Sequence, residues 1–166
     1  MDDEDYDDEP FEGARTMSLS ITLGVLMMEW PLHELMVFRL FEKLCKAPPE
    51  QARALWFSII SLDMRLRIMT QLATLVADEE CKREALSLIV TTRRLSETRN
   101  KFTHWSWTTS DGRDWAVQDP RKVGRNVLAV SADSVRALST EIHRANDSLI
   151  QLALRMDGLQ IAREPE

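Results

Sequence analysis

The chain has 166 residues, of which 44% are hydrophobic and 29% are charged, and only five are glycine and six proline. This length suits one domain with its own core, and the scarcity of Gly and Pro excludes a turn-rich all-β fold. The two cysteines, Cys45 and Cys81, are in no disulfide or metal-binding spacing. We therefore expect a reducing compartment, the cytoplasm.

The net charge of −6 comes from the N-terminal end. Residues 2–12 contain eight acids and no Lys or Arg, and without them 19 acids stand against 21 bases. We expect residues 1–16 to be a disordered acidic tail and residues 17–160 to form a single helical domain. The tail could aid solubility, or it could be an arm that covers a basic site. The remaining charge is compatible with a polyanionic partner without requiring one.

No membrane segment is expected from the pattern of apolar residues. The most apolar stretch, residues 19–28, ends at Glu29 and is too short to span a bilayer. The N-terminus is acidic, whereas a signal peptide begins with basic residues.

Apolar residues recur at three- and four-residue intervals over residues 18–46, which predicts a first helix that Pro31 starts or kinks. A proline-containing break at residues 46–49 separates it from a second helix. That helix is expected to run over residues 49–76, because its apolar stripe contains no internal Gly or Pro.

Asp63 lies in the second predicted helix, one turn before Arg67, and this spacing favours an ion pair over a role in a functional site. A third helix is predicted from about Cys81 to Phe102. After it, alternating polar and apolar residues around a turn at residues 110–112 predict a β-hairpin.

Residues 127–130 could add a short third strand. Ser131 or Asp133 would then cap a last helix that runs to about Met156. The predicted fold class is all-α, a bundle of about four main helices with a small β-hairpin inserted before the last one. The inward face of that helix is expected to consist of Leu138, Ile142, Leu149, Leu152 and Ala153.

Arg99 is the most unusual residue of the third helix, because it falls in the middle of its apolar face. A guanidinium there needs a carboxylate, backbone carbonyls or a bound phosphate. An ion pair with Glu34, which lies beside the apolar stripe of the first helix, is the structural alternative to a functional site.

His104 follows Arg99 by five residues, so the two side chains point about 140° apart on a straight helix. Either the helix ends before His104 or a second subunit completes the site. A second apolar facet, formed by Leu86 and Ile89 on the His104 side, is the expected surface for a homodimer. Asn100 precedes His104 by four residues and could orient its imidazole.

The string Arg99-Asn100-Lys101-Phe102-Thr103-His104 resembles the R-x(4–6)-H motif of HEPN-family ribonucleases, in which a polar residue, often Asn, follows the Arg. The predicted bundle, with the motif near the end of its third long helix, also resembles that family. The likeness extends more weakly over about residues 20–155. Many relatives have Gly after the His, whereas this chain has Trp105.

The resemblance implies RNA cleavage without a metal or cofactor, by attack of the ribose 2′-hydroxyl on the adjacent phosphate. His104 would act as general base or acid, Arg99 would bind the phosphate, and Asn100 would orient either of them. Further contacts to RNA are expected from Lys101, Trp105 and Arg93. The chain would be a toxin or defence component, acting as a homodimer with a possible antitoxin partner. A catalytically silent HEPN-like module that binds RNA or protein is the alternative.

Three tryptophans, Trp105, Trp107 and Trp115, surround the predicted hairpin. They could stack on RNA bases, but on a hairpin packed against a bundle they are more often anchors.

Residues 93–125 form the most basic window of the chain, with eight bases against four acids. Most of these bases are expected to lie on a solvated face.

Overall fold

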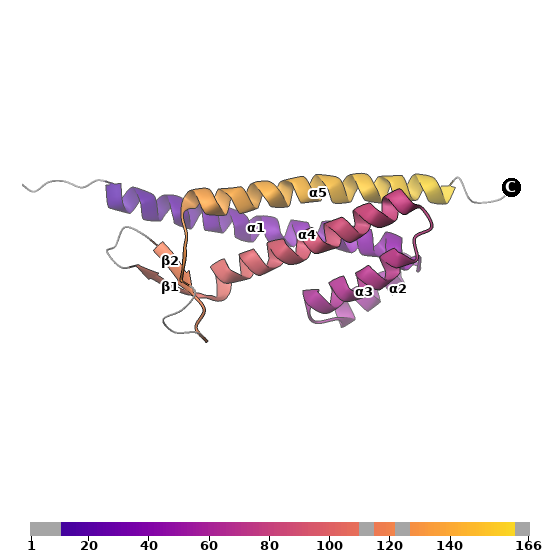
Figure 1. Cartoon of the computed structure of the whole chain (residues 1–166), viewed down its shortest axis with the longest axis horizontal. Helices are drawn as coiled ribbons and strands as arrows, with labels where there is room; N and C mark the ends of the chain where they lie inside the picture. The colour runs from indigo at the N-terminus through magenta and orange to yellow at the C-terminus, as the bar shows by residue number, and fades with distance from the viewer. Residues whose placement is uncertain (1–10, 110–114, 122–126, 162–166) are drawn as a thin grey trace, which may run out of the picture.

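The computed structural model describes residues 11–109, 115–121 and 127–161, and side chains within these ranges from Arg15 to Gly158. It confirms an all-α bundle with a small antiparallel sheet before the last helix (Figure 1). The elements, in chain order, are α1 (Phe11–Cys45), α2 (Pro49–Ser58), α3 (Leu62–Thr74), α4 (Glu79–His104), β1 (Ser106–Thr109), β2 (Trp115–Gln118), β3 (Val127–Ala129) and α5 (Ala132–Ile161).

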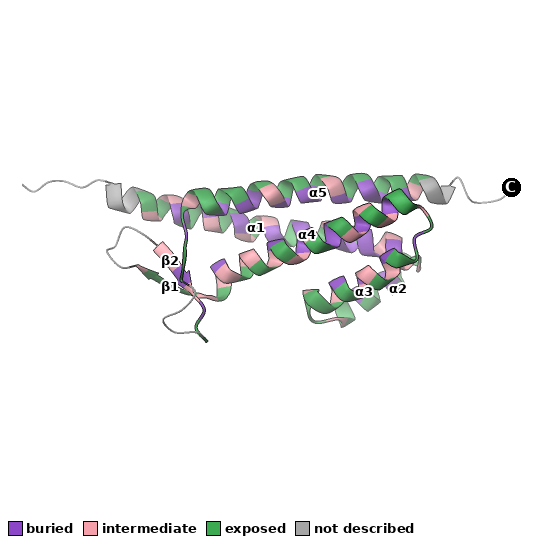
Figure 2. Ribbon diagram, in the orientation of Figure 1, coloured by how far each residue is buried: buried purple, intermediate pink, exposed green. Residues whose placement is uncertain are grey.

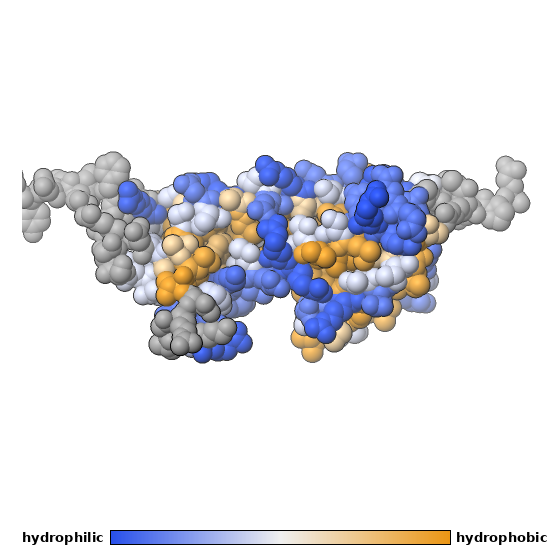
Figure 3. Space-filling view, in the orientation of Figure 1, coloured by the Kyte–Doolittle hydropathy of each residue, from blue (hydrophilic) through white to orange (hydrophobic). Residues whose placement is uncertain are grey.

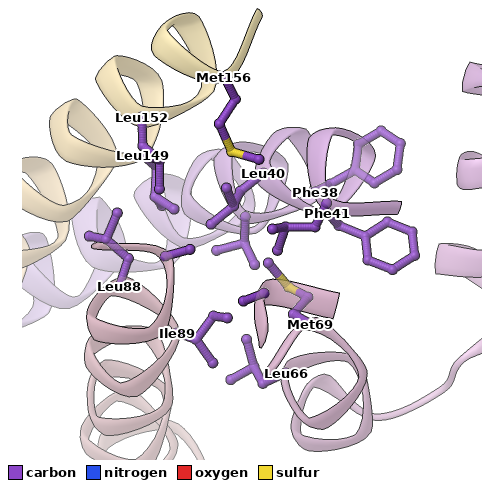
Figure 4. Packing of buried hydrophobic residues seen from close by; sticks show 14 of the residues in the cluster. Phe38, Leu40, Phe41, Leu66, Met69, Leu88, Ile89, Leu149, Leu152 and Met156 are labelled. Atoms are coloured by element: carbon purple, nitrogen blue, oxygen red, sulfur yellow. The ribbon is translucent and has the colours of Figure 1, made fainter. Parts of the chain in front are cut away.

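Three long helices, α1, α4 and α5, form the body of the molecule, with α2 and α3 near one end and the sheet near the other (Figure 1). Their buried residues form purple stripes that face one another (Figure 2). One apolar cluster joins the second half of α1 to α2, α3, the start of α4 and the second half of α5 (Figure 4). A second cluster joins the first half of α1 to the end of α4, the sheet and the start of α5.

α1 is longer and less interrupted than the sequence suggested. It begins at Phe11, inside the segment expected to be a tail, and continues through Pro31 to Cys45. The prediction that Pro31 starts a helix is therefore wrong. Thr16 already belongs to the folded unit, since its hydroxyl accepts a hydrogen bond from Trp115 Nε1 at 3.4 Å. The acidic residues 1–10 lie outside the described ranges.

The single helix expected over residues 49–76 is wrong, because the chain leaves the helix at Ile59 and re-enters it after Ser61. The Ser61 hydroxyl caps α3 by accepting a hydrogen bond from Met64 N at 3.2 Å. Arg65 Nε donates to the carbonyl of Ile59 at 2.9 Å and to that of Trp56 at 3.1 Å, which also accepts from Ile59 N at 3.3 Å. These bonds satisfy backbone groups that the break leaves open, so no Gly or Pro is needed there.

The later elements follow the predicted order. Asp78 caps α4 by accepting from Cys81 N at 2.8 Å, and Ser131 caps α5 by accepting from Ser134 N at 3.2 Å. β1 pairs with β2, and the third strand pairs with β2 on its other side. The residues of the predicted turn, 110–112, lie outside the described ranges. The inward face predicted for α5 is buried.

The apolar facet of Leu86 and Ile89, expected to join two copies of the chain, is not a surface. Ile89 is 2% exposed and Leu86 packs against the same core cluster. The reason is that α3 covers this side of α4. The facet completes the protein's own core, so the prediction of a dimer through it is wrong.

α1 is also long and apolar enough, by length and composition, to cross a membrane over Arg15–Cys45. About a third of its most apolar window is buried inside the bundle, against α4 and α5. A core helix of a soluble protein passes the same test, so the expected lack of a membrane segment stays a prediction.

Candidate functional site

The last turns of α4 present the predicted motif. The helix ends at His104, and Trp105 takes an extended conformation while its backbone N–H still bonds Lys101 O at 3.2 Å. Trp107 closes the end of the helix, since its Nε1 donates to Phe102 O at 3.0 Å. The motif is therefore held where a long, capped helix meets the sheet.

Arg99 lies on the core face of α4, as its spacing predicts, since the flanking apolar positions are buried. Its guanidinium lies over the Trp30 ring of α1, with Cζ 5.4 Å from the ring centroid. Nη1 donates to Asn100 Oδ1 at 3.2 Å, while the buried Nε–H has no partner among the described residues. An unpaired buried donor is unfavourable, so this N–H would gain from an anionic oxygen once the side chains that cover it move aside.

The alternative of an Arg99–Glu34 ion pair is wrong. Within the part of the chain that the structure describes, Arg99 forms no ion pair, and Glu34 accepts a hydrogen bond from Trp30 Nε1 at 2.7 Å. The indole therefore stands between the two charged groups. Its face attracts the cation and its N–H satisfies the carboxylate.

Asn100 and His104 are both exposed near the end of α4. Asn100 hydrogen-bonds Arg99, and no bond between its amide and the His104 ring is present among the described side chains. The expectation that Asn100 orients His104 is therefore not met in this structure. The helix continues through His104, so the offset of about 140° from Arg99 remains. The structure thus brings Arg99 and Asn100 together and leaves His104 apart from Arg99.

Arg93 shares a face of α4 with Asn100 and His104, because intervals of seven and eleven residues return to almost the same side of a helix. Its Nε lies 3.3 Å from Asp63 Oδ1, without an aligned hydrogen bond. Asp63 also pairs with Arg67 at 2.8 Å, which confirms the predicted i, i+4 contact.

Figure 3 shows the surface indented below α4, between the sheet and α2–α3. A hollow of about 360 Å³ beside it is lined by Arg67, Ile68, Thr70, Gln71 and Arg93.

The tryptophans around the sheet are half-buried and pack against the second apolar cluster. The indole N–H of Trp107 and that of Trp115 are bonded within the protein, which makes both rings anchors. Trp105 differs, because its ring faces the Lys101 ammonium at 5.7 Å. Lys101 and Trp105 thus form a cationic and aromatic pair directly beside His104. Of the basic window, Arg113, Lys122 and Arg125 lie outside the described residues.

Sequence reasoning missed a buried polar cluster between α1 and α5. His33 is fully buried, and its Nδ1 lies 2.7 Å from Asn146 Oδ1, which assigns the ring proton to Nδ1 because a carbonyl oxygen only accepts. Burial lowers the pKa of His33, against smaller raising effects of the Asn146 hydrogen bond and the Glu34 charge. Nearby, Glu29 accepts a bond from Ser139 and lies 3.0 Å from His143 Nε2. The spacing of His33 from Trp30 and Val37 was the one signal of this cluster.

Among the described residues, no three His, Cys, Asp or Glu side chains are gathered so that they could hold a metal ion. Comparisons of the chain with protein-family models, with curated proteins and with solved structures found no match. The function is therefore argued from the chain's own residues.

Proposed function

We propose that this chain is a metal-independent endoribonuclease of the HEPN type. One observation carries the proposal: the last turns of α4 hold a guanidinium whose buried Nε–H has no partner among the described residues, an exposed amide bonded to that guanidinium, and an exposed imidazole on another side of the same helix end. These are the groups that phosphate binding and proton transfer require. The proposal rests on these groups and on the resemblance of the motif.

In the proposed reaction, His104 takes the proton of a ribose 2′-hydroxyl. The 2′-oxygen then bonds to the adjacent phosphorus, and the bond from phosphorus to the 5′-oxygen breaks. The products are a 2′,3′-cyclic phosphate and a 5′-hydroxyl, which takes up a proton from solvent. Arg99 would stabilise the extra negative charge on the phosphate oxygens as the bond forms, with its plane fixed by Trp30 and Asn100.

The remaining predicted contacts surround this centre. Lys101 could bind a neighbouring phosphate, and the ring of Trp105 could stack on a base. Arg93 lies two to three helical turns away on the same face as His104, where a continuing RNA strand would pass. An enzyme of this kind would act in the cytoplasm as a toxin or defence component, with an antitoxin as a possible partner.

A second function is favoured by a specific observation. Arg99 already contacts Trp30 and Asn100 and points about 140° away from His104. In that arrangement the guanidinium joins α4 to α1, and the chain could be a catalytically silent module that binds RNA or protein. This function needs no rearrangement, whereas cleavage needs RNA to contact both side chains around the end of the helix.

The deciding experiment is to incubate the full-length protein with single-stranded RNA in EDTA and to identify the product ends. We expect 2′,3′-cyclic phosphate ends and a loss of roughly 10²- to 10⁴-fold in rate for His104→Ala. His143→Ala is the matched control, since His143 is also exposed but lies on α5 and contacts Glu29. If the wild type leaves the RNA intact, or if His104→Ala cuts RNA as fast as the wild type, the catalytic proposal is wrong. The chain would then be the binding module.

A further inference from the structure

A hollow lies where α1, β2 and the start of α5 meet, at the sheet end of the molecule (Figure 1). Its volume is about 320 Å³, which is at the lower end of the range for small-molecule sites in proteins. Its walls come from residues 15–19, Trp115 and residues 130–136. We call this space the junction hollow. None of the residues assigned to RNA cleavage lines it.

The buried part of this lining is apolar. Leu19 and Val130 are each 5% exposed and belong to the second apolar cluster. The ring of Trp115 is half-buried and packs against the same cluster. The junction hollow therefore offers aliphatic and aromatic surface on which a flat apolar ring can pack.

Hydrogen bonds within the protein hold these walls in place. Val130 N donates to Trp115 O at 2.8 Å, which fixes the segment before α5 to β2. Trp115 Nε1 donates to Thr16 Oγ1 at 3.4 Å, which fixes the indole to α1. A site that is already formed loses little conformational entropy when a ligand binds, so even a small ligand can bind there.

The exposed part of the lining has a net positive charge. Arg15 of α1 and Arg136 of α5 both line the junction hollow, against one carboxylate, Asp133. Asp133 already pairs with Arg136. Within the described part of the chain, Arg15 forms no ion pair. The described lining thus has a charge of +1, and the guanidinium of Arg15 can donate to an anion without first leaving a carboxylate.

We propose that the junction hollow binds a small organic anion, a molecule with a flat apolar ring and one carboxylate or similar anionic group. The ring would pack on Leu19, Val130 and Trp115, and the anionic group would accept hydrogen bonds from Arg15 and Arg136. A ligand bound in this way contacts α1, β2 and α5 together. It therefore stabilises the folded protein as its concentration rises.

The hollow beside Arg93 is a poorer site for such a molecule. Both of its arginines, Arg67 and Arg93, pair with the same carboxylate of Asp63. Its described lining also contains no aromatic ring. Only the junction hollow combines a buried apolar surface with a guanidinium that has no carboxylate partner among the described residues.

The test is an NMR titration of the full chain, followed at the indole N–H signal of Trp115, with four compounds. 1-Naphthoate has both the ring and the carboxylate. 1-Naphthalenemethanol has the ring without a charge, 1-naphthylmethylamine has the ring with a positive charge, and acetate has the carboxylate without the ring. We expect naphthoate to bind with a dissociation constant of about 1 mM or lower. The other three should bind at least roughly tenfold more weakly.

Variants test which residues bind the compound. Arg15→Gln and Arg136→Gln should each weaken naphthoate binding about tenfold and leave 1-naphthalenemethanol unaffected, because each removes a charge-assisted hydrogen bond. Arg94→Gln is the matched control, since Arg94 is also exposed and pairs with a carboxylate but does not line the hollow. Ser18→Leu places a larger side chain in the lining and should weaken both compounds.

The proposal is wrong if naphthoate and 1-naphthalenemethanol bind equally well, or if Arg15→Gln and Arg136→Gln bind naphthoate as tightly as Arg94→Gln does. It is also wrong if the Trp115 signal does not move at about 10 mM naphthoate. If single-stranded RNA displaces naphthoate from the His104→Ala variant, and Arg15→Gln weakens RNA binding by the same factor, the hollow is part of an RNA path instead. None of these outcomes depends on ribonuclease activity.

Discussion

Arg99 and Trp30, from two different helices, form a cation–π contact in which the guanidinium carbon lies 5.4 Å from the centre of the indole ring. The contact links α4, which holds the motif, to α1, which contributes to both apolar clusters. Trp30 is itself fixed by its hydrogen bond to Glu34. Arg99 therefore has a stabilising contact on one side and an unpaired N–H on its buried edge.

The first prediction uses Arg99→Lys to separate the stabilising contact of Arg99 with Trp30 from its proposed binding of phosphate. Lysine keeps the charge and can lie over the ring, but it lacks the planar fork that binds two oxygens of one phosphate. We expect the free energy of unfolding, measured in urea, to change by less than about 1 kcal/mol. RNA cleavage should fall by about 10²-fold or more. A variant that cleaves like the wild type would show that Arg99 serves only as the link to Trp30.

The position of Arg99 was predictable and its partner was not. The helical period places it on the apolar face of α4 from neighbouring residues alone. Its contact with Trp30 joins residues far apart in sequence, and a period does not tell which helices meet. Glu34 was the expected partner because opposite charges attract. The indole satisfies both groups instead, which only the packed structure shows.

The break between α2 and α3 shows another limit of sequence patterns. The apolar stripe continues across residues 59–61, so its period gives no sign of the break. The side chain that stabilises the break, Arg65, lies four residues after Ser61 and bonds backward to two carbonyls. By contrast, the hairpin and the third strand were predicted, because alternation and turn residues are local signals.

The second prediction concerns this break. Arg65→Met should lower the free energy of unfolding by about 1–3 kcal/mol, because the carbonyl of Ile59 loses its donor and that of Trp56 keeps only the bond from Ile59 N. The variant also loses the packing of the guanidinium on the Trp56 ring. Arg67→Met is the matched control. Its pair with Asp63 is exposed, so we expect a change of at most about 1 kcal/mol. If Arg65→Met and Arg67→Met lower the free energy of unfolding in urea by the same amount, the stabilising role of Arg65 is contradicted.

The third prediction follows from the buried His33. Because burial lowers its pKa in the folded state below the ordinary value of 6.5, the unfolded chain binds a proton more readily. The contribution of His33 to stability is constant above that pH. This contribution to the free energy of unfolding falls as the pH drops below 6.5. It levels off once His33 is protonated in the folded state as well.

The measurement is urea unfolding between about pH 5 and pH 7.5 for the wild type and His33→Gln. Glutamine can donate to Asn146 but does not titrate, so the variant should lose part of the decline toward low pH. His143→Gln, on the exposed side of α5, controls for the loss of any histidine. Parallel curves for the wild type and His33→Gln would rule out His33 as the cause.

The last prediction rests on the proposed function and uses Asp63, whose two carboxylate oxygens pair with Arg67 and Arg93. Asp63→Asn removes the negative charge that these arginines share, which leaves them free to bind RNA phosphates. We expect tighter binding of single-stranded RNA. The dependence of log affinity on log salt should steepen by about 0.7 for each further phosphate that the protein neutralises. Stability should change by no more than about 1 kcal/mol, because the pairs are exposed.

Fluorescence anisotropy with a labelled RNA, over a series of salt concentrations, measures both the affinity and its salt dependence. Asp133→Asn is the matched control, since it removes the same charge from the first turn of α5, where Asp133 pairs with Arg136. If the two variants raise affinity equally, the effect is one of net charge and not of the α4 face. If Asp63→Asn leaves affinity and salt dependence unchanged, RNA does not pass Arg93, and the bound strand must be confined to the end of α4 near His104.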